Sequence, residues 1–402
     1  MYERHLASRL KAALEDTPVV LLNGARQVGK STLARQIQGR RYLTLDDADT
    51  LSAASLDPQG FIESLHEPVV LDEIQKIPNL FPALKLSVDR NRRPGHFLLT
   101  GSADVLLLPR VSESLAGRME ILTLWPLSQG EIDGRTEGFV DRLFSVDPLP
   151  SAQGGEPAGD LMERILRGGY PEPMGRPVGP RREDWFRAYV SALLQRDVRD
   201  LAQVERLSDL PRLLSLLAGR AASLLNISDL SRGLGIPLST LRRHLSLLET
   251  TFLVQMLPAW SSNMGKRLVR APKVLFNDSA LLAHLLGAGA GSPAATGALL
   301  ENFVAMEVLK QTAWSLTRPQ MLHFRTHAGR EVDLVLEDRS GRIVGIEVKS
   351  STTLGPGDFA GLKALEEACG ERFVRGVVLY GGRESLPFGK SLQALPVSAL
   401  WS

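Results

Sequence analysis

The chain has 402 residues, a length that favours two or three domains over one. Hydrophobic residues make up 44% of it and charged residues 23%, as in an ordinary globular protein, so wholesale disorder is excluded. The formal net charge is only +2, so no general excess of positive charge indicates a nucleic-acid partner, and any basic surface must be local.

The first element expected is an amphipathic helix over residues 1–14, because Leu6, Leu10 and Leu14 recur every four residues. This pattern is unlike a signal peptide, and no apolar run approaches the roughly 18 to 20 residues that span a bilayer. The single cysteine, Cys369, cannot form a disulfide within the chain, which fits a reducing compartment. We therefore expect a cytoplasmic protein with no membrane partner.

Short apolar runs alternate with helix-like segments between residues 17 and 132. The runs lie at residues 19–22, 42–45, 69–71, 97–99 and 121–124. Buried parallel strands are continuous apolar runs rather than alternating ones. The pattern therefore predicts an α/β fold in which a parallel sheet carries helices on both faces.

The first apolar run is followed by a phosphate-binding sequence of the form G-x-x-x-x-G-K-[ST]. It reads Gly24-Ala25-Arg26-Gln27-Val28-Gly29-Lys30-Ser31 and continues into Thr32. The glycines let backbone N–H groups point inward at an anion, and the helix that begins at Ser31 adds the positive end of its dipole. We expect the site to bind ATP or ADP, Lys30 to reach the β- and γ-phosphates of ATP, and the Ser31 hydroxyl to complete the Mg²⁺ shell.

A second polar element ends the run at residues 69–71, where Asp72 and Glu73 follow directly. Asp72 is expected to hold Mg²⁺ through water, and Glu73 to orient and polarise the attacking water. The alternative, an exposed acidic pair in a turn, does not explain the placement after a buried strand. Thr100 and Ser102 end the next run and are candidate sensors of the γ-phosphate, although a plain strand-to-turn transition explains either residue alone.

The remainder of the chain divides at two joints rich in Pro, Gly, Ser and Ala, residues 145–159 and 287–297. Residues 160–225 have the spacing of a helical lid or connector. Ser228 and Ser239 are expected to cap helices over 229–234 and 240–248, and apolar residues of a strand follow, which is the order of a winged helix-turn-helix. The domains expected are an ATPase core (1–132), a lid (133–225), a winged helix (226–262) and a C-terminal α/β domain (263–402).

Polar and basic residues occupy the first turns of the second helix of this motif, where a recognition helix contacts DNA. The candidate DNA contacts are Ser239, Thr240, Arg242, Arg243 and His244, with Lys266 and Arg267 nearby. The alternative is that the motif is an assembly surface and its arginines form a solvated face.

The last domain contains a set of ionisable residues on neighbouring expected strands. Asp333 lies in one expected strand, and Glu347 and Lys349 share one face of the next because side chains alternate along a strand. This arrangement resembles the core of the PD-(D/E)xK nucleases. With Glu301 from a preceding helix, the carboxylates suit Mg²⁺ or Mn²⁺, and Lys349 is positioned to act on the nucleophilic water. The alternatives are a solvent-exposed pair, or a nuclease-like fold used only for binding. The usual proline before the aspartate is replaced by Val332.

Taken together, several blocks resemble AAA-superfamily ATPases of a bacterial and archaeal group that carries a C-terminal domain of unknown function. The blocks are Gly24 to Thr32, Leu71-Asp72-Glu73-Ile74-Gln75, Leu99-Thr100-Gly101-Ser102, Ser114-Leu115-Ala116-Gly117-Arg118, Gly168-Gly169-Tyr170-Pro171, Arg196-Asp197-Val198-Arg199 and Leu248-Glu249-Thr250-Thr251-Phe252-Leu253. The resemblance implies an extra strand between the phosphate-loop strand and the Asp-Glu strand, and active sites shared by the subunits of a homo-oligomer such as a ring or hexamer. It also implies that Arg118 is an arginine finger; the alternative is a local salt bridge to Glu113 or Glu120.

These features predict an oligomeric Mg²⁺-dependent ATPase that remodels branched or single-stranded DNA, with a metal-dependent nuclease step in its last domain. The competing hypothesis is a nucleotide-operated switch that binds DNA or a protein partner without turnover or cleavage.

Overall fold

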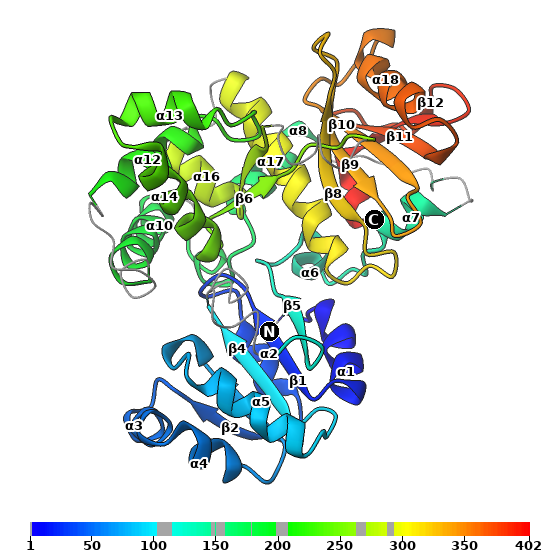
Figure 1. The fold of residues 1–402 in the computed structure, drawn as a ribbon. Helices are drawn as coiled ribbons and strands as arrows, with labels where there is room; N and C mark the ends of the chain where they lie inside the picture. Colours follow the sequence, from blue (N-terminus) through cyan, green and yellow to red (C-terminus); the bar gives the residue numbers. More distant parts are fainter. Residues whose placement is uncertain are drawn as a thin grey trace. The chain divides into compact units, whose positions relative to one another are not determined.

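The computed structural model describes residues 2–102, 115–145, 149, 157–177, 179–197, 208–262, 271–287 and 293–402 (Figure 1). These residues form two compact units. The N-terminal unit comprises residues 3–126 and 246–253, and the C-terminal unit comprises mainly residues 127–245 and 254–402. Within the described ranges, no helix combines the length and the apolar character needed to cross a membrane.

A five-stranded parallel sheet forms the centre of the N-terminal unit. Its strands are β1 (Val19–Asn23), β2 (Arg41–Thr44), β3 (Val69–Asp72), β4 (Phe97–Gly101) and β5 (Met119–Thr123). Their order is β2-β3-β4-β1-β5, and every neighbouring pair is parallel. The predicted parallel sheet is confirmed, and so is the extra strand, because β4 separates β1 from β3.

Helices pack against this sheet through its buried side chains. They are α1 (Leu6–Asp16), α2 (Lys30–Gln36), α3 (Ala48–Leu56), α4 (Pro58–Glu63), the short η1 (Ile74–Lys76) and α5 (Leu80–Arg90). Alternate residues of β1 and β3 enter one apolar cluster with α5, while α1 contacts β1 and α2 contacts β3 and β4. The helix predicted over residues 1–14 begins at Leu6 and buries Leu6, Leu10 and Leu14, as its spacing predicted.

Many helices follow the first sheet, including those over the range 160–225 where the sequence indicated helical spacing. They are α6 (Gln129–Asp133), α7 (Phe139–Phe144), α8 (Ala158–Arg167), α9 (Pro171–Met174), α10 (Pro180–Ala192), the π-helical η3 (Leu193–Asp197), α12 (Asp209–Ala218), α13 (Ile227–Leu234), α14 (Leu238–Thr250), α16 (Ser279–Leu286) and α17 (Pro293–Thr312). All of them belong to the C-terminal unit except the last residues of α14, from 246 on.

The helix pair α13 and α14 differs from its prediction at both helix starts. Asn226, not Ser228, caps α13, because its side chain accepts the N–H of Asp229. Ser239 lies inside α14 rather than before it. After α14, β6 (Val254–Leu257) pairs antiparallel with β7 (Lys273–Phe276), so the two-stranded element continues beyond the boundary predicted at residue 262.

The chain ends in a mixed six-stranded sheet with the order β12-β13-β11-β10-β9-β8. Its elements are β8 (Gln320–Arg325), β9 (Glu331–Glu337), β10 (Ile343–Lys349), η4 (Pro356–Phe359), α18 (Ala360–Cys369), η5 (Gly370–Arg372), β11 (Phe373–Tyr380), β12 (Leu386–Pro387), β13 (Leu392–Pro396) and η6 (Val397–Trp401). Helix α18 packs on β9, β10 and β11, and α17 contacts β10.

Candidate functional sites

The phosphate-binding sequence forms the turn between β1 and α2. Gly24 has φ 141°, and a Cβ atom there would lie only 2.2 Å from Leu124 O, so the loop requires glycine at this position. Gln27 adopts φ 63°, a left-handed conformation that turns the chain toward the helix start. The backbone is therefore already curved as an anion-binding loop requires.

Lys30 lies buried under this loop. Its Nζ donates hydrogen bonds to Gly24 O at 2.8 Å and to Ala25 O at 2.7 Å. These carbonyls hold the ammonium beside the position where nucleotide phosphates bind in a P-loop. When a nucleotide binds, a phosphate oxygen can replace these carbonyls as the hydrogen-bond acceptor, because the Lys30 ammonium can donate to either group.

Asp72, at the end of β3, is the polar centre of the site. The residue is 5% exposed, and its carboxylate accepts hydrogen bonds from Ser31 Oγ at 2.9 Å, from Tyr42 OH at 2.6 Å and from Thr100 Oγ1. Ser31 and Asp72 thus bring a hydroxyl and a carboxylate together at the loop, which is the oxygen donor set that Mg²⁺ prefers. These two residues fit the role of Mg²⁺ ligands, directly or through water.

Glu73 follows in a left-handed conformation with φ 62°. Its Oε2 accepts hydrogen bonds from Gln75 Nε2 and, at 3.3 Å, from Ser102 Oγ, while its N–H donates to Thr100 Oγ1 at 3.3 Å. The two residues predicted as γ-phosphate sensors, Thr100 and Ser102, therefore contact the Asp-Glu pair itself. Removing either hydroxyl would therefore remove a hydrogen bond to the carboxylate of Asp72 or Glu73.

Arg118 forms an ion pair with Asp89 at 2.5 Å and donates to Ala116 O at 3.1 Å. The alternative to the finger role was a local salt bridge to Glu113 or Glu120. The structure pairs Arg118 with Asp89, and Glu120 pairs with Arg9. Glu113 lies outside the described residues. The finger role of Arg118 remains a prediction.

The sequence analysis did not identify two residues that contact the site. Arg4 donates to Val28 O and to Trp125 O, both at 2.7 Å, and so ties the phosphate loop to the segment after β5. Tyr42 donates to Asp72, and burial together with this hydrogen bond raises the pKa of its phenol. Neither residue lies in a motif, so no local pattern marked them.

The ionisable residues predicted in the last domain do lie together, with a lysine among them. Lys273 Nζ is 2.7 Å from Glu301 Oε1 and 3.0 Å from Asp333 Oδ1, and Lys349 Nζ is 2.8 Å from Glu347 Oε1. Burial raises the pKa of Glu301 to about 8 and that of Glu347 to about 7, with the charge of Asp333 adding to both shifts. Although burial alone lowers the pKa of Lys273, Asp333 and Glu301 outweigh it and hold that pKa above its ordinary value.

This arrangement does not fit the divalent metal that the sequence suggested. Among the described residues there is no group of three or more His, Cys, Asp or Glu side chains placed to hold a metal ion. The physical reason is Lys273, whose ammonium lies against the oxygens of Glu301 and Asp333 that a metal would need.

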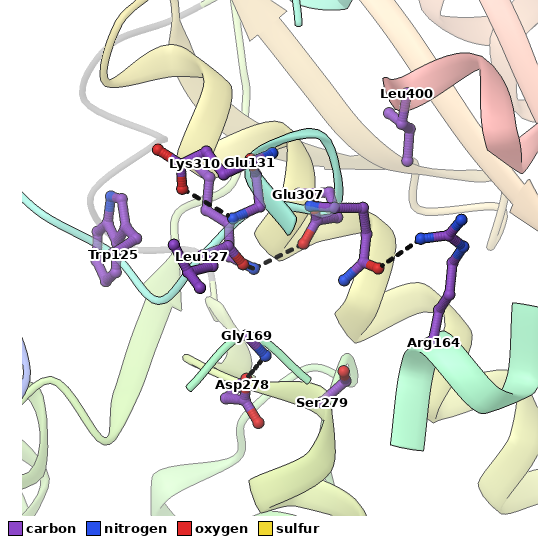
Figure 2. Close-up of polar contacts among 12 residues, drawn as sticks. Trp125, Leu127, Glu131, Arg164, Gly169, Asp278, Ser279, Glu307, Lys310 and Leu400 are labelled. Carbon is purple, nitrogen blue, oxygen red and sulfur yellow. Dashed lines mark hydrogen bonds and ion pairs between the residues drawn. The ribbon is translucent and has the colours of Figure 1, made fainter. Parts of the chain in front are cut away.

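A buried polar network accounts for the Gly168-Gly169-Tyr170 block. Asp278 accepts the N–H of Gly169 at 2.7 Å, and Lys310 pairs with Glu307 at 2.6 Å and donates to Leu127 O at 2.9 Å (Figure 2). A Cβ atom at Gly169 would lie 2.2 Å from Leu127 O, so a larger residue would separate these groups. The block therefore has a structural role inside the C-terminal unit.

The residues of α14 that were predicted to contact DNA differ in their exposure to solvent. Ser239, Arg242 and Arg243 are exposed and Thr240 is half-buried, but His244 is 0% exposed. His244 faces the interior with Leu241, so its prediction as a DNA contact was wrong. Lys266 and Arg267 lie outside the described residues, as do residues 198 and 199 of the Arg196–Arg199 block.

Three parts of the chain match models of known protein families. Residues 16–133 match a family model described as an AAA domain, and with the P-loop and the Asp-Glu strand they form an AAA-type ATPase domain. Residues 158–292 and 296–400 match models described as domains of unknown function, DUF8612 and DUF4143.

Two relatives then define the family. They are the uncharacterized proteins Mb2031c of Mycobacterium bovis and Rv2008c of Mycobacterium tuberculosis, each 32% identical over 405 residues, covering 99% of this chain and 84% of the relative. The chain belongs to the same family as these two proteins.

Solved structures give weaker likenesses. The Walker-type ATPase PABY2304 of Pyrococcus abyssi has a TM-score of 0.41 at 15% identity, over 71% of this chain and 96% of that one. The STAND protein PH0952 of Pyrococcus horikoshii, a signal transduction ATPase with a tetratricopeptide repeat sensor, has a TM-score of 0.28 at 11% identity, over 76% of this chain and 46% of that one.

Proposed function

We propose that this AAA-type ATPase hydrolyses ATP with Mg²⁺ and works as a homo-oligomer that remodels DNA. The observation that carries the ATPase assignment is the convergence of Ser31, Thr100 and Tyr42 on Asp72, beside Glu73 and under the phosphate loop. Such a site needs little covalent chemistry, because phosphoryl transfer is accelerated mainly by positioning and by charge stabilisation.

Each side chain then has a definite task. Lys30 exchanges the carbonyls of Gly24 and Ala25 for phosphate oxygens, and the backbone N–H groups of the loop bind the remaining ones. Ser31 and Asp72 hold Mg²⁺, which when bound neutralises charge on the β- and γ-phosphates. Glu73 orients the attacking water and accepts its proton, while Gln75 and Ser102 hold Oε2 of its carboxylate.

The DNA part of the proposal is supported by α14, which carries exposed Ser239, Arg242 and Arg243 on its first turns. Arginines in this place suit phosphate or base contacts. The strands that follow α14 supply the two-stranded element expected after a recognition helix. The metal-dependent nuclease step is left out of the proposal because Lys273 occupies its carboxylates.

The test is steady-state ATP hydrolysis with and without forks, junctions, gapped duplexes, single strands and RNA. We expect one DNA form to raise the rate, and Arg242→Ala with Arg243→Ala to remove the stimulation while keeping the basal rate. Arg232→Ala is the matched control, because Arg232 is an exposed arginine of α13 that pairs with Asp229. If no DNA form stimulates turnover, the remodelling function is wrong, and nucleotide-dependent binding without turnover would favour the switch instead.

A further inference from the structure

The cation that the carboxylates of the last domain hold is a lysine of the same unit. Lys273 contacts Glu301 and Asp333 through its ammonium, and its side chain is only 3% exposed. Its charge also lowers the pKa of Glu347, opposing the effect of burial there. One ammonium therefore acts on all three carboxylates that the sequence predicted as metal ligands.

The backbone of Lys273 is held on both sides, so its side chain leaves from a fixed strand. Lys273 pairs with Leu257 of β6 on one side and forms a β-bridge with Leu224 on the other. The preceding residue, Pro272, accepts the N–H of Leu225 at 2.8 Å. These contacts direct the buried stem toward the carboxylates and leave it little freedom to swing away.

The carboxylate oxygens are largely committed to donors within the unit. Asp333 Oδ1 accepts from Lys273 and Oδ2 from the N–H of Val348 at 3.0 Å, while Glu347 Oε1 accepts from Lys349. Glu347 Oε2 is buried without a hydrogen-bond donor among the described residues. A divalent cation needs several such oxygens at once and would meet the charge of Lys273 beside it.

We propose that Lys273 is the resident cation of this centre, so that the nuclease-like sheet holds an internal ammonium in place of Mg²⁺ or Mn²⁺. The proposal goes beyond the ATPase function and is independent of it. It assigns the domain a metal-independent carboxylate–ammonium centre, and it predicts that removing the ammonium uncovers a metal site.

The test is titration of the nucleotide-free full chain with Mn²⁺, followed by the loss of the free-ion EPR signal. Any binding at the P-loop is separated from this centre by its response to Asp333→Asn. We expect the wild type and Asp333→Asn to bind Mn²⁺ equally, because the wild type binds no Mn²⁺ at this centre. Lys273→Met keeps the length of the stem without the charge, and we expect it to gain one Mn²⁺ per chain, which Asp333→Asn in the same background removes.

Lys349→Met is the matched control, because it deletes the other ammonium of the cluster and leaves Lys273 in place. We expect it to gain no Mn²⁺. Wild-type binding of Mn²⁺ that is lost in Asp333→Asn would overturn the proposal, whether or not the Lys273 variants fold. So would a folded Lys273→Met, verified by circular dichroism, that gains no metal, or an equal gain in Lys349→Met. Lys273→Ala serves as a second variant if Lys273→Met does not fold.

Discussion

Arg4 illustrates how a residue outside every motif can shape the nucleotide site. It is buried to 9% exposure and is the donor for two main-chain carbonyls, Val28 O in the phosphate loop and Trp125 O beyond β5. A buried carbonyl that loses a charged donor costs about 1–3 kcal/mol. The N-terminal residues just before α1 therefore contribute to the shape of the loop.

We predict that Arg4→Met weakens Mg–ATP binding about tenfold, the change that corresponds to about 1.4 kcal/mol. The reason is that Val28 O, freed from its donor, lets the loop leave its anion-binding shape. The measurement is the dissociation constant by calorimetry. Arg9→Met is the control, because Arg9 lies on α1 and forms a partly exposed ion pair with Glu120. A partly exposed pair contributes little, so the affinity of Arg9→Met should stay within about twofold of the wild type. Equal affinities for Arg4→Met and Arg9→Met would refute this role.

Residues whose role depends on local sequence could be predicted, and residues that act across the fold could not. Lys30 and Ser31 were identified from the phosphate-loop sequence, and Asp72 from its place at the end of a short apolar run. Arg4 lies 24 residues from Val28 in the sequence, and Tyr42 lies 30 residues from Asp72. No spacing rule links either residue to the site.

At the scale of elements, the apolar runs predicted all five parallel strands, since buried strands need no alternation. The contact between Glu347 and Lys349 on β10 was also predictable, because the period-two alternation of a strand places both side chains on the same face. What the sequence did not reveal is β7. This strand carries Lys273, which lies 28 residues from Glu301 and 60 from Asp333 in the sequence. The resemblance to a nuclease therefore predicted a metal ion at a position where the fold places the ammonium of Lys273.

Burial decided the other errors at this scale. The helix α14 runs from Leu238 to Thr250, and its period places His244 on the same inner face as Leu241. Polarity of the residue type suggested a DNA contact, but the helical position determines exposure. Arg242 and Arg243 remain candidates because that same period leaves them exposed.

At the scale of the whole molecule, the proposed oligomer requires that one subunit complete the site of another. We predict that Arg118→Ala and Lys30→Ala are each nearly inactive and that mixing them restores hydrolysis. The first variant binds ATP and the second supplies Arg118, so a shared site becomes complete only in the mixture. Steady-state ATP turnover across mixing ratios measures the recovery.

Asp89→Ala provides the control for this mixing experiment. It removes the ion-pair partner of Arg118 but keeps the arginine itself. If Asp89→Ala loses activity as fully as Arg118→Ala, the arginine acts through its local pair. If the mixture stays inactive although light scattering detects mixed oligomers, the shared-site architecture is wrong.

The most direct measurement of the central claim is single-turnover and steady-state hydrolysis of Mg–ATP by the wild type and by Glu73→Gln, with nucleotide binding measured on the same samples. A general base in its working position contributes about 10²–10⁴-fold to a rate, so Glu73→Gln should lose turnover by at least about a hundredfold while it binds ATP as tightly as the wild type. An unchanged rate in Glu73→Gln, or a wild type that takes up no ATP, would contradict the account.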